Sequence, residues 1–181
     1  MTGDHARAWT AACQGEVLIC FAWPDEPVPR GFLGSVDWIL GGRASRLFLQ
    51  KREGLSAGDV FLLNTEGMLP MEKLVILALP DPGACSLTLM PRLGNMVRHV
   101  LNGLAVCSAT IALPHRLPFS GSLARTAFTE GYGSEQAQRD LTFLDWEPPP
   151  PPQERRISAS ESGPLGQRVP AEESGSAAAH P

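Results

Sequence analysis

The sequence has few of the features that mark a metal site. Its 181 residues include four cysteines and four histidines, and these stand apart along the chain. A structural zinc site needs Cys and His ligands at short, fixed spacings such as Cys-x-x-Cys, and no such pair occurs. We therefore predict no metal site and no cofactor. Cys20 and Cys107 lie inside apolar runs, and this placement predicts small buried thiols.

Clusters of positive charge and long apolar runs are also missing. The 15 Lys and Arg residues are scattered singly or in pairs, and the net charge is -4. Nucleic acids and anionic membrane surfaces attract clustered basic residues, so we expect neither as a partner. No apolar run approaches the roughly 20 residues that cross a bilayer, and the amino terminus lacks the apolar segment of a signal peptide. We therefore expect a cytoplasmic protein.

The composition divides the chain into three parts. Residues 1–14 show no hydrophobic periodicity, which predicts a loose arm. Residues 15–147 alternate between apolar runs and helical patterns, as one folded domain does. Five consecutive prolines follow at 148–152, and the rest of the chain is rich in Ser, Gly, Ala, Glu and Arg. Such a segment cannot bury enough apolar surface to offset its ordering entropy, so we predict a disordered tail over residues 148–181.

The domain is predicted to be an α/β fold. Continuous apolar runs, typical of strands covered on both faces, occur at residues 17–23, 60–63, 73–79, 104–113 and 141–146. Helical spacing of apolar residues occurs at 36–48, 90–104 and 122–128. Strands that alternate with helices predict a mostly parallel sheet with helices on both faces, and the short turn after residue 63 predicts one antiparallel pair. The expected architecture is a three-layer, mixed sheet.

Residues 29–49 combine a turn, a helix start, an apolar stripe and two glycines. Ser35 or Asp37 can cap a helix by accepting a bond from an unpaired backbone N–H. The apolar positions after this cap follow one helical face, so we predict a single helix. Gly41 and Gly42 fall inside it, and each costs about 1 kcal/mol relative to alanine. This cost predicts a close approach of the helix to the sheet.

The order of short motifs from residue 16 to about residue 79 is the most specific feature of the sequence. A strand leads through a proline turn to an Arg-Gly pair, a Gly-x-Val-Asp-Trp helix start, a Ser-Arg-Leu step and a Leu-Leu-x-Thr-x-Gly-x-Leu-Pro hairpin. The residues that carry these motifs are Pro29, Arg30, Gly31, Gly34, Val36, Asp37, Trp38, Ser45, Arg46, Leu47, Leu62, Leu63, Thr65, Gly67, Leu69 and Pro70. In this order the chain resembles the amino-terminal domain of the leucyl aminopeptidase family. The resemblance implies a fold similar to a macro domain.

The resemblance carries no catalytic residues. In that family the two metal ions and their ligands belong to a separate carboxy-terminal domain. Residues 64–67, Asn-Thr-Glu-Gly, are similar to the catalytic Asn-Thr-Asp-Ala-Glu-Gly-Arg signature, but they lack its Asp-Ala step and its arginine. We therefore expect a stand-alone, non-catalytic module that binds a protein partner, self-associates or regulates another protein.

Four residues of the motif series are candidates for docking or for scaffolding. They are Arg30, Asp37, Trp38 and Arg46. We expect Asp37 to cap its own helix and to meet one of the two arginines. We expect Trp38 to pack at the domain edge or to face a partner.

Two alternative functions remain open. Open α/β sheets bind ligands at the carboxyl ends of their strands, and macro domains bind ADP-ribose there through a glycine-rich phosphate loop. The nearest segments here are 118–122 and 80–84, which lack that pattern and which we interpret as ordinary turns. A small hydrolase would instead need Cys107 beside His99 or His115, with Asp37 as the orienting acid. Each of these four residues also has an ordinary structural interpretation.

Overall fold

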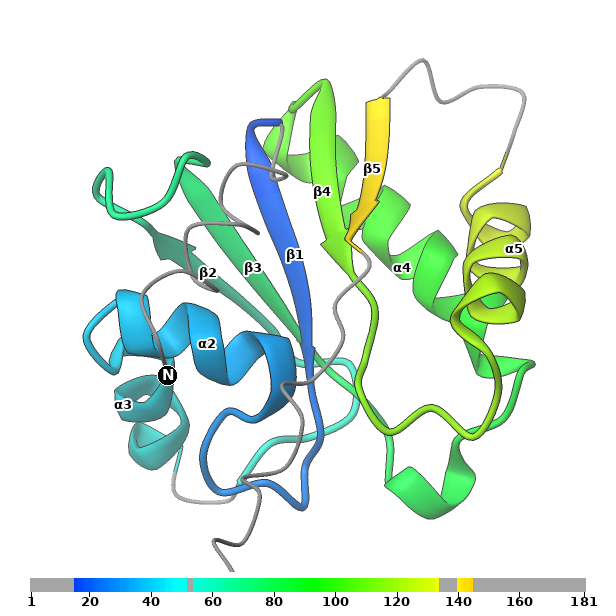
Figure 1. Ribbon diagram of the computed structural model, residues 1–181, viewed down its shortest axis with the longest axis horizontal. Helices are drawn as coiled ribbons and strands as arrows, with labels where there is room; N and C mark the ends of the chain where they lie inside the picture. The colour runs from blue at the N-terminus through cyan, green and yellow to red at the C-terminus, as the bar shows by residue number, and fades with distance from the viewer. Residues whose placement is uncertain (1–14, 52–53, 134–139, 145–181) are drawn as a thin grey trace, which may run out of the picture. The chain divides into compact units, whose positions relative to one another are not determined.

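A mixed sheet of five strands forms the centre of the domain (Figure 1). The computed structural model describes residues 15–51, 54–133 and 140–144, so the predicted arm and tail lie outside the described residues. The strands are β1 (Val17–Ala22), β2 (Val60–Asn64), β3 (Lys73–Ala78), β4 (Ser108–Ala112) and β5 (Asp140–Leu144). They lie in the order β2-β3-β1-β4-β5. Only the β2–β3 pair is antiparallel among these strands.

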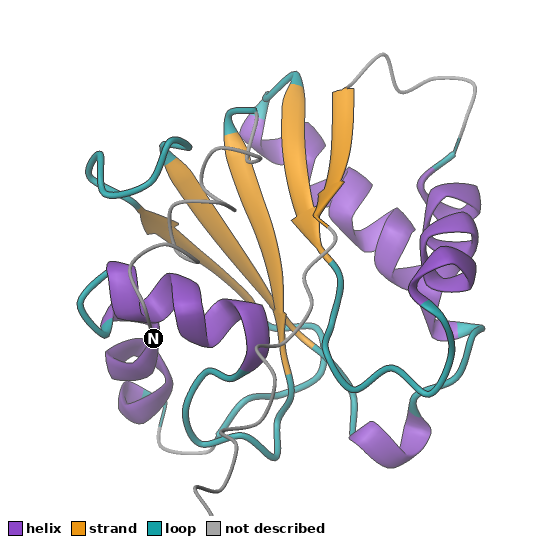
Figure 2. Ribbon diagram, viewed as in Figure 1, coloured by secondary structure: helices purple, strands orange, loops and turns teal. Residues whose placement is uncertain are grey.

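Helices cover both faces of the sheet (Figure 2). One face carries α2 (Gly31–Ile39) and α3 (Arg43–Gln50), and the other carries α4 (Leu89–Leu104) and α5 (Gly121–Tyr132). A 3-10 turn, η1 (Pro82–Ala84), precedes α4. The predicted three-layer architecture with one antiparallel pair is therefore confirmed. Among the helices of the described ranges, none combines the length and the apolar character that crossing a membrane requires.

The position of β1 between two helical layers explains why its sequence is apolar without alternation. All six of its residues are buried. Val17, Ile19 and Phe21 belong to the apolar core beneath α4 and α5, whereas Leu18 and Cys20 belong to the core beneath α2 and α3. Successive side chains of a strand point to opposite faces, so a strand between two helical layers needs an apolar residue at every position. The Cys20 thiol is 1% exposed, as predicted.

The edge strand β2 has a different burial pattern. Its residues alternate between exposed and half-buried. Phe61 and Leu63 pack against the core beneath α2 and α3, whereas Val60 and Leu62 are 46% and 53% exposed. Their cross-strand partners, Leu77 and Val75, are buried beneath α4 and α5. The helical layer on that side therefore covers β3 but leaves β2 uncovered.

The prediction of one helix over residues 36–48 is wrong, because the chain forms two helices there. Gly41 and Gly42 have φ values of 62° and 77°, in the left-handed region that glycine enters most easily. A Cβ at Gly41 would meet no atom within 4 Å. The two glycines therefore make the turn between α2 and α3, and the predicted close approach to the sheet does not occur.

The boundaries of two other predicted elements also change. Cys107 was expected inside a strand, but β4 begins at Ser108 and Cys107 is exposed. Ser35 was a predicted helix cap, but it is a buried residue inside α2. The N-cap of α2 is Arg30, which makes no side-chain capping bond. An apolar run locates a strand well, but the position of its first hydrogen bond depends on the neighbouring strands.

The helices α4 and α5 approach each other at two glycines. A Cβ at Gly94 would lie 2.1 Å from the carbonyl oxygen of Phe128, and a Cβ at Gly131 would lie 2.0 Å from that of Pro91. No real Cβ tolerates such distances from the backbone. The two helices therefore pack backbone against backbone.

We predict that Gly94→Ala destabilises the domain by about 3 kcal/mol, because an added methyl must push α5 away from α4. Gly103 is the matched control, since it lies in the same helix and a Cβ there would meet nothing within 4 Å. Gly103→Ala should raise stability by about 0.5–1 kcal/mol through helix propensity. Urea unfolding measures both free energies. Equal stability of the two variants would contradict the predicted close packing.

Candidate ligand-binding pocket

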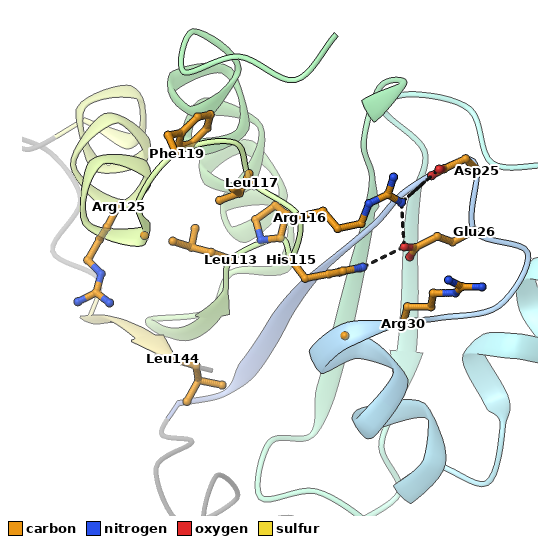
Figure 3. Close-up of a pocket in the computed structure, with 13 residues that line it drawn as sticks. Asp25, Glu26, Arg30, Leu113, His115, Arg116, Leu117, Phe119, Arg125 and Leu144 are labelled. Atoms are coloured by element: carbon orange, nitrogen blue, oxygen red, sulfur yellow. Dashed lines mark hydrogen bonds and ion pairs between the residues drawn. The ribbon is translucent and has the colours of Figure 1, made fainter. Parts of the chain in front are cut away.

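A cavity of about 1000 Å³ opens at the carboxyl ends of β1, β4 and β5 (Figure 3). The segment after β1 contributes acidic residues, the segment after β4 contributes both charged and apolar residues, and the first residues of α2 and α5 complete the wall. The lining residues are Asp25, Glu26, Arg30, Gly31, Leu113, Pro114, His115, Arg116, Leu117, Phe119, Gly121, Arg125 and Leu144. This is the edge at which open α/β sheets place their ligand clefts.

Four charged or titratable side chains join the two loops of the pocket, and we call them the loop clasp: Asp25, Glu26, His115 and Arg116. Glu26 is 5% exposed, and its Oε1 lies 2.9 Å from His115 Nε2 and 3.2 Å from Arg116 Nη1. The same Arg116 nitrogen lies 3.2 Å from Asp25 Oδ2. Figure 3 shows these side chains pointing toward one another across the gap between the loops. Residues about ninety positions apart are thereby held together at one wall.

The backbone around the clasp is fixed by further contacts. Trp23 Nε1 donates a hydrogen bond to the His115 carbonyl oxygen at 3.0 Å, and the Arg116 guanidinium lies 5.9 Å from the centre of the Trp23 ring. Arg116 has a φ of 65°, a left-handed conformation that costs a non-glycine residue free energy. Hydrogen bonds to Asp25 and Glu26 raise the pKa of Arg116, so it stays cationic. The clasp thus offsets a strained backbone with charge-assisted bonds.

The imidazole of His115 rests directly on the start of α2. A Cβ at Gly31 would lie 2.7 Å from His115 Cγ and Nδ1. Gly31 also has a φ of 59°, so the first position of α2 favours glycine for two reasons. The Arg-Gly pair of the sequence motif therefore serves the pocket, because its glycine makes room for the histidine ring.

The opposite wall is apolar and ends at α5. Leu117, Phe119 and Leu144 line it, and α5 begins at Gly121, where a Cβ would meet nothing within 4 Å. The Ser120 hydroxyl caps this helix by accepting from the Leu123 N–H at 3.4 Å. A helix N-terminus carries a partial positive charge. The pocket therefore has a charged wall, an apolar wall and an electropositive helix end.

The four predicted docking residues separate in the structure. Arg30 lines the pocket. Arg46 Nη1 donates to the Gly41 carbonyl oxygen at 2.9 Å, so it supports the turn between α2 and α3. Trp38 is 79% exposed. Its predicted packing at the domain edge is therefore wrong, and its contact with a partner stays a prediction.

Asp37 caps a helix, but not the predicted one. Its Oδ1 accepts from the Ala44 N–H at 2.7 Å and from the Ser45 N–H at 3.2 Å, and its Oδ2 accepts from the Ser45 hydroxyl at 2.5 Å. These donors are the first residues of α3. Asp37 is 7% exposed and lies inside α2. It therefore folds α3 back against α2, which explains its place just before the two glycines.

The residues of the hydrolase hypothesis are not assembled. Cys107 is exposed before the amino end of β4, whereas His115 follows the carboxyl end of the same strand. His99 lies in α4, and Asp37 binds the start of α3. A strand of five residues separates Cys107 from His115, so these two residues do not meet. His99 and Asp37 lie in helices on opposite faces of the sheet, so no triad forms with His99 either.

The two segments predicted to be ordinary turns, 80–84 and 118–122, differ in the structure. Residues 80–84 form η1, where Asp81 Oδ1 accepts from the Gly83 N–H at 2.7 Å. Residues 118–122 contribute Phe119 and Gly121 to the pocket. The segment at 64–67 runs from the last residue of β2 into a turn, where Arg43 binds Glu66 and lowers its pKa. In the ranges that the structure describes, no three His, Cys, Asp or Glu residues gather as metal ligands would.

Comparison with known proteins gives the fold of the chain. No family model and no curated protein matches it. Among solved structures, the macrodomain of Mycobacterium tuberculosis DarG aligns with a TM-score of 0.57 and 11% identity, over 71% of this chain and 88% of that one. The fold is macrodomain-like. A macrodomain of Oceanobacillus iheyensis aligns with a TM-score of 0.56 and 11% identity, over 72% of this chain and 77% of that chain.

A tomato leucine aminopeptidase aligns with a TM-score of 0.54 and 18% identity. The alignment covers 76% of this chain and 31% of the aminopeptidase. The two kinds of neighbour share one sheet architecture with the chain. At such identities the likeness shows the fold alone. Any statement about function has to be argued from the residues of the pocket.

We predict that Asp37→Ala destabilises the domain by about 2 kcal/mol, because α3 loses its cap and a buried N–H loses its acceptor. Asp37→Asn keeps one acceptor oxygen and should cost about half as much. Thermal unfolding monitored by circular dichroism compares the two. An Asp37→Ala variant with wild-type stability would contradict the capping role.

Proposed function

We propose that this protein binds a small, phosphate-bearing ligand of the nucleotide or ADP-ribose class in the pocket at the carboxyl ends of its strands. The observation that carries the proposal is the combination of a large cavity with a buried carboxylate, arginines and a helix N-terminus at its wall. Ligand pockets are of about 300–1,000 Å³ and pair apolar surface with a few polar groups. The cavity fits that description.

The walls suit the parts of such a ligand. Leu117 and Phe119 offer an apolar surface to a base. The start of α5 at Gly121 is open, and backbone N–H groups at a helix N-terminus favour an anion such as phosphate. Arg30 and Arg125 add positive charge at the lining. ADP-ribose is the ligand that the resemblance to macro domains implies for this edge of the sheet.

The interaction-module hypothesis is the second candidate function, and Trp38 supports it. An indole that is 79% exposed contributes little to the domain's own core. Tryptophan is enriched among the residues that dominate binding energy at protein interfaces. Trp38 lies near the end of α2, whereas Gly31, which lines the pocket, is the first residue of that helix. A partner held there would leave the pocket to its own ligand.

We predict that Gly121→Leu abolishes or weakens ADP-ribose binding by at least about tenfold, because its side chain enters the mouth of the cavity without a clash. Gly103→Leu is the matched control, since its added side chain also meets nothing within 4 Å and lies in α4, away from the pocket lining. Isothermal titration with ADP-ribose, AMP and ADP measures the affinities. The proposal is wrong if the wild-type protein gives no heat with any of the three.

We predict that Trp38→Ala removes a protein partner recovered from native lysate by the tagged wild-type chain, a loss of about 2 kcal/mol or more in binding. Leu123→Ala is the control, because Leu123 is also exposed, at 53%, but lies in α5. Both variants should unfold at the wild-type temperature. Equal recovery by all three proteins would contradict a docking role for Trp38.

A further inference from the structure

The most unusual side chain in the pocket is Glu26. It is 5% exposed and lines the cavity, whereas Asp25 beside it is 46% exposed at its side chain. A buried carboxylate costs several kcal/mol of desolvation unless its partners compensate it. Asp25 already bonds Arg116 at the loop surface, so joining the two loops does not by itself require a buried acid.

Within the part of the chain that the structure describes, the side-chain partners of Glu26 use one of its two oxygens. His115 Nε2 and Arg116 Nη1 both reach Oε1, at 2.9 Å and 3.2 Å. An ionised carboxylate offers about four acceptor positions over its two oxygens. No hydrogen bond to Oε2 occurs among the described residues, so this oxygen can accept one from a ligand. Figure 3 shows Glu26 directed toward the space between the loops, where the clasp forms one wall.

The charges around Glu26 decide what kind of donor fits. At this wall the carboxylates of Asp25 and Glu26 are matched by the guanidiniums of Arg30 and Arg116. A phosphate placed against Glu26 would meet a fixed negative charge at short range in a partly buried site, which is strongly unfavourable. A cation would add charge to a balanced wall. A neutral hydroxyl or amino donor suits Oε2 without disturbing that balance.

We propose that Glu26 is the residue that recognises the uncharged polar part of the ligand, accepting a hydrogen bond at Oε2 from a sugar hydroxyl or an exocyclic amine. This inference rests on the proposed function and adds an orientation to it. The hydroxyl- or amine-bearing end of the ligand lies at the loop clasp, and its phosphates lie away from the clasp, toward Gly121. The pocket then selects a nucleotide or a nucleotide sugar over free phosphate or pyrophosphate.

Isothermal titration of the wild-type chain, Glu26→Gln and Asp25→Asn with ADP-ribose and with sodium pyrophosphate tests this inference. The wild type should bind ADP-ribose more tightly than pyrophosphate. Glu26→Gln should weaken ADP-ribose binding by about tenfold or more, the value of one hydrogen bond to a charged group, and should not weaken pyrophosphate binding. Asp25→Asn is a comparison variant within the clasp, because it removes the other carboxylate on Arg116. It should weaken ADP-ribose binding less than Glu26→Gln does.

The outcomes separate the two proposals. If the wild type binds ADP-ribose and Glu26→Gln binds it equally well, or loses both probes equally, the role of Glu26 is wrong and the proposed function stands. If the wild type binds neither probe nor any nucleotide, both fail. Thermal unfolding checks that each variant folds. If Glu26→Gln does not fold, Glu26→Asp keeps the charge but withdraws the carboxylate by one methylene, and it should show the same selective loss of ADP-ribose binding.

Discussion

The fold depends on the burial of β1 between two helical layers and between two parallel neighbours. β1 pairs with β3 over all six of its residues and with β4 over three of them. Its alternate side chains enter the two separate cores. Because β1 is held on every side, the points where the chain leaves β1 and β4 are fixed next to each other. Glu26 and His115 meet for that reason, although 89 positions separate them.

The sequence predicts those parts of the fold whose physical cause is local. A run such as Leu74 to Leu77 has no polar position, which predicts a strand covered on both faces. Gly41 and Gly42 were more ambiguous, because a glycine pair fits both a close packing contact and a left-handed turn. Their φ values decide for the turn. The cap by Asp37 follows the same rule: the residue type predicts a cap, but the identity of the capped helix depends on the turn that follows.

The pocket is difficult to predict from the sequence, because its charged wall comes from two turns that lie far apart along the chain. Asp25 and Glu26 lie in a proline-rich turn, and His115 and Arg116 lie in another, so each pair looks like ordinary loop polarity. One signal could have found them. Both turns follow strands that the sequence predicts to be parallel, and such turns lie at the same edge of a sheet. The burial of Glu26, however, arises only when the loops close on each other.

The contact of α4 with α5 has a mechanical consequence for the pocket. Because Gly94 and Gly131 bring the two backbones together, α5 cannot shift without moving the longest helix of the described domain. The end of α5 that lines the pocket at Gly121 is therefore held in a fixed position relative to α4. The loop before α2 is joined to the loop after β4 by the side-chain bonds of the clasp and by the bond from Trp23 to the His115 carbonyl oxygen. The two ends of the pocket are therefore tied to the fold in different ways, the α5 end by backbone packing and the clasp by bonds that side chains make between loops.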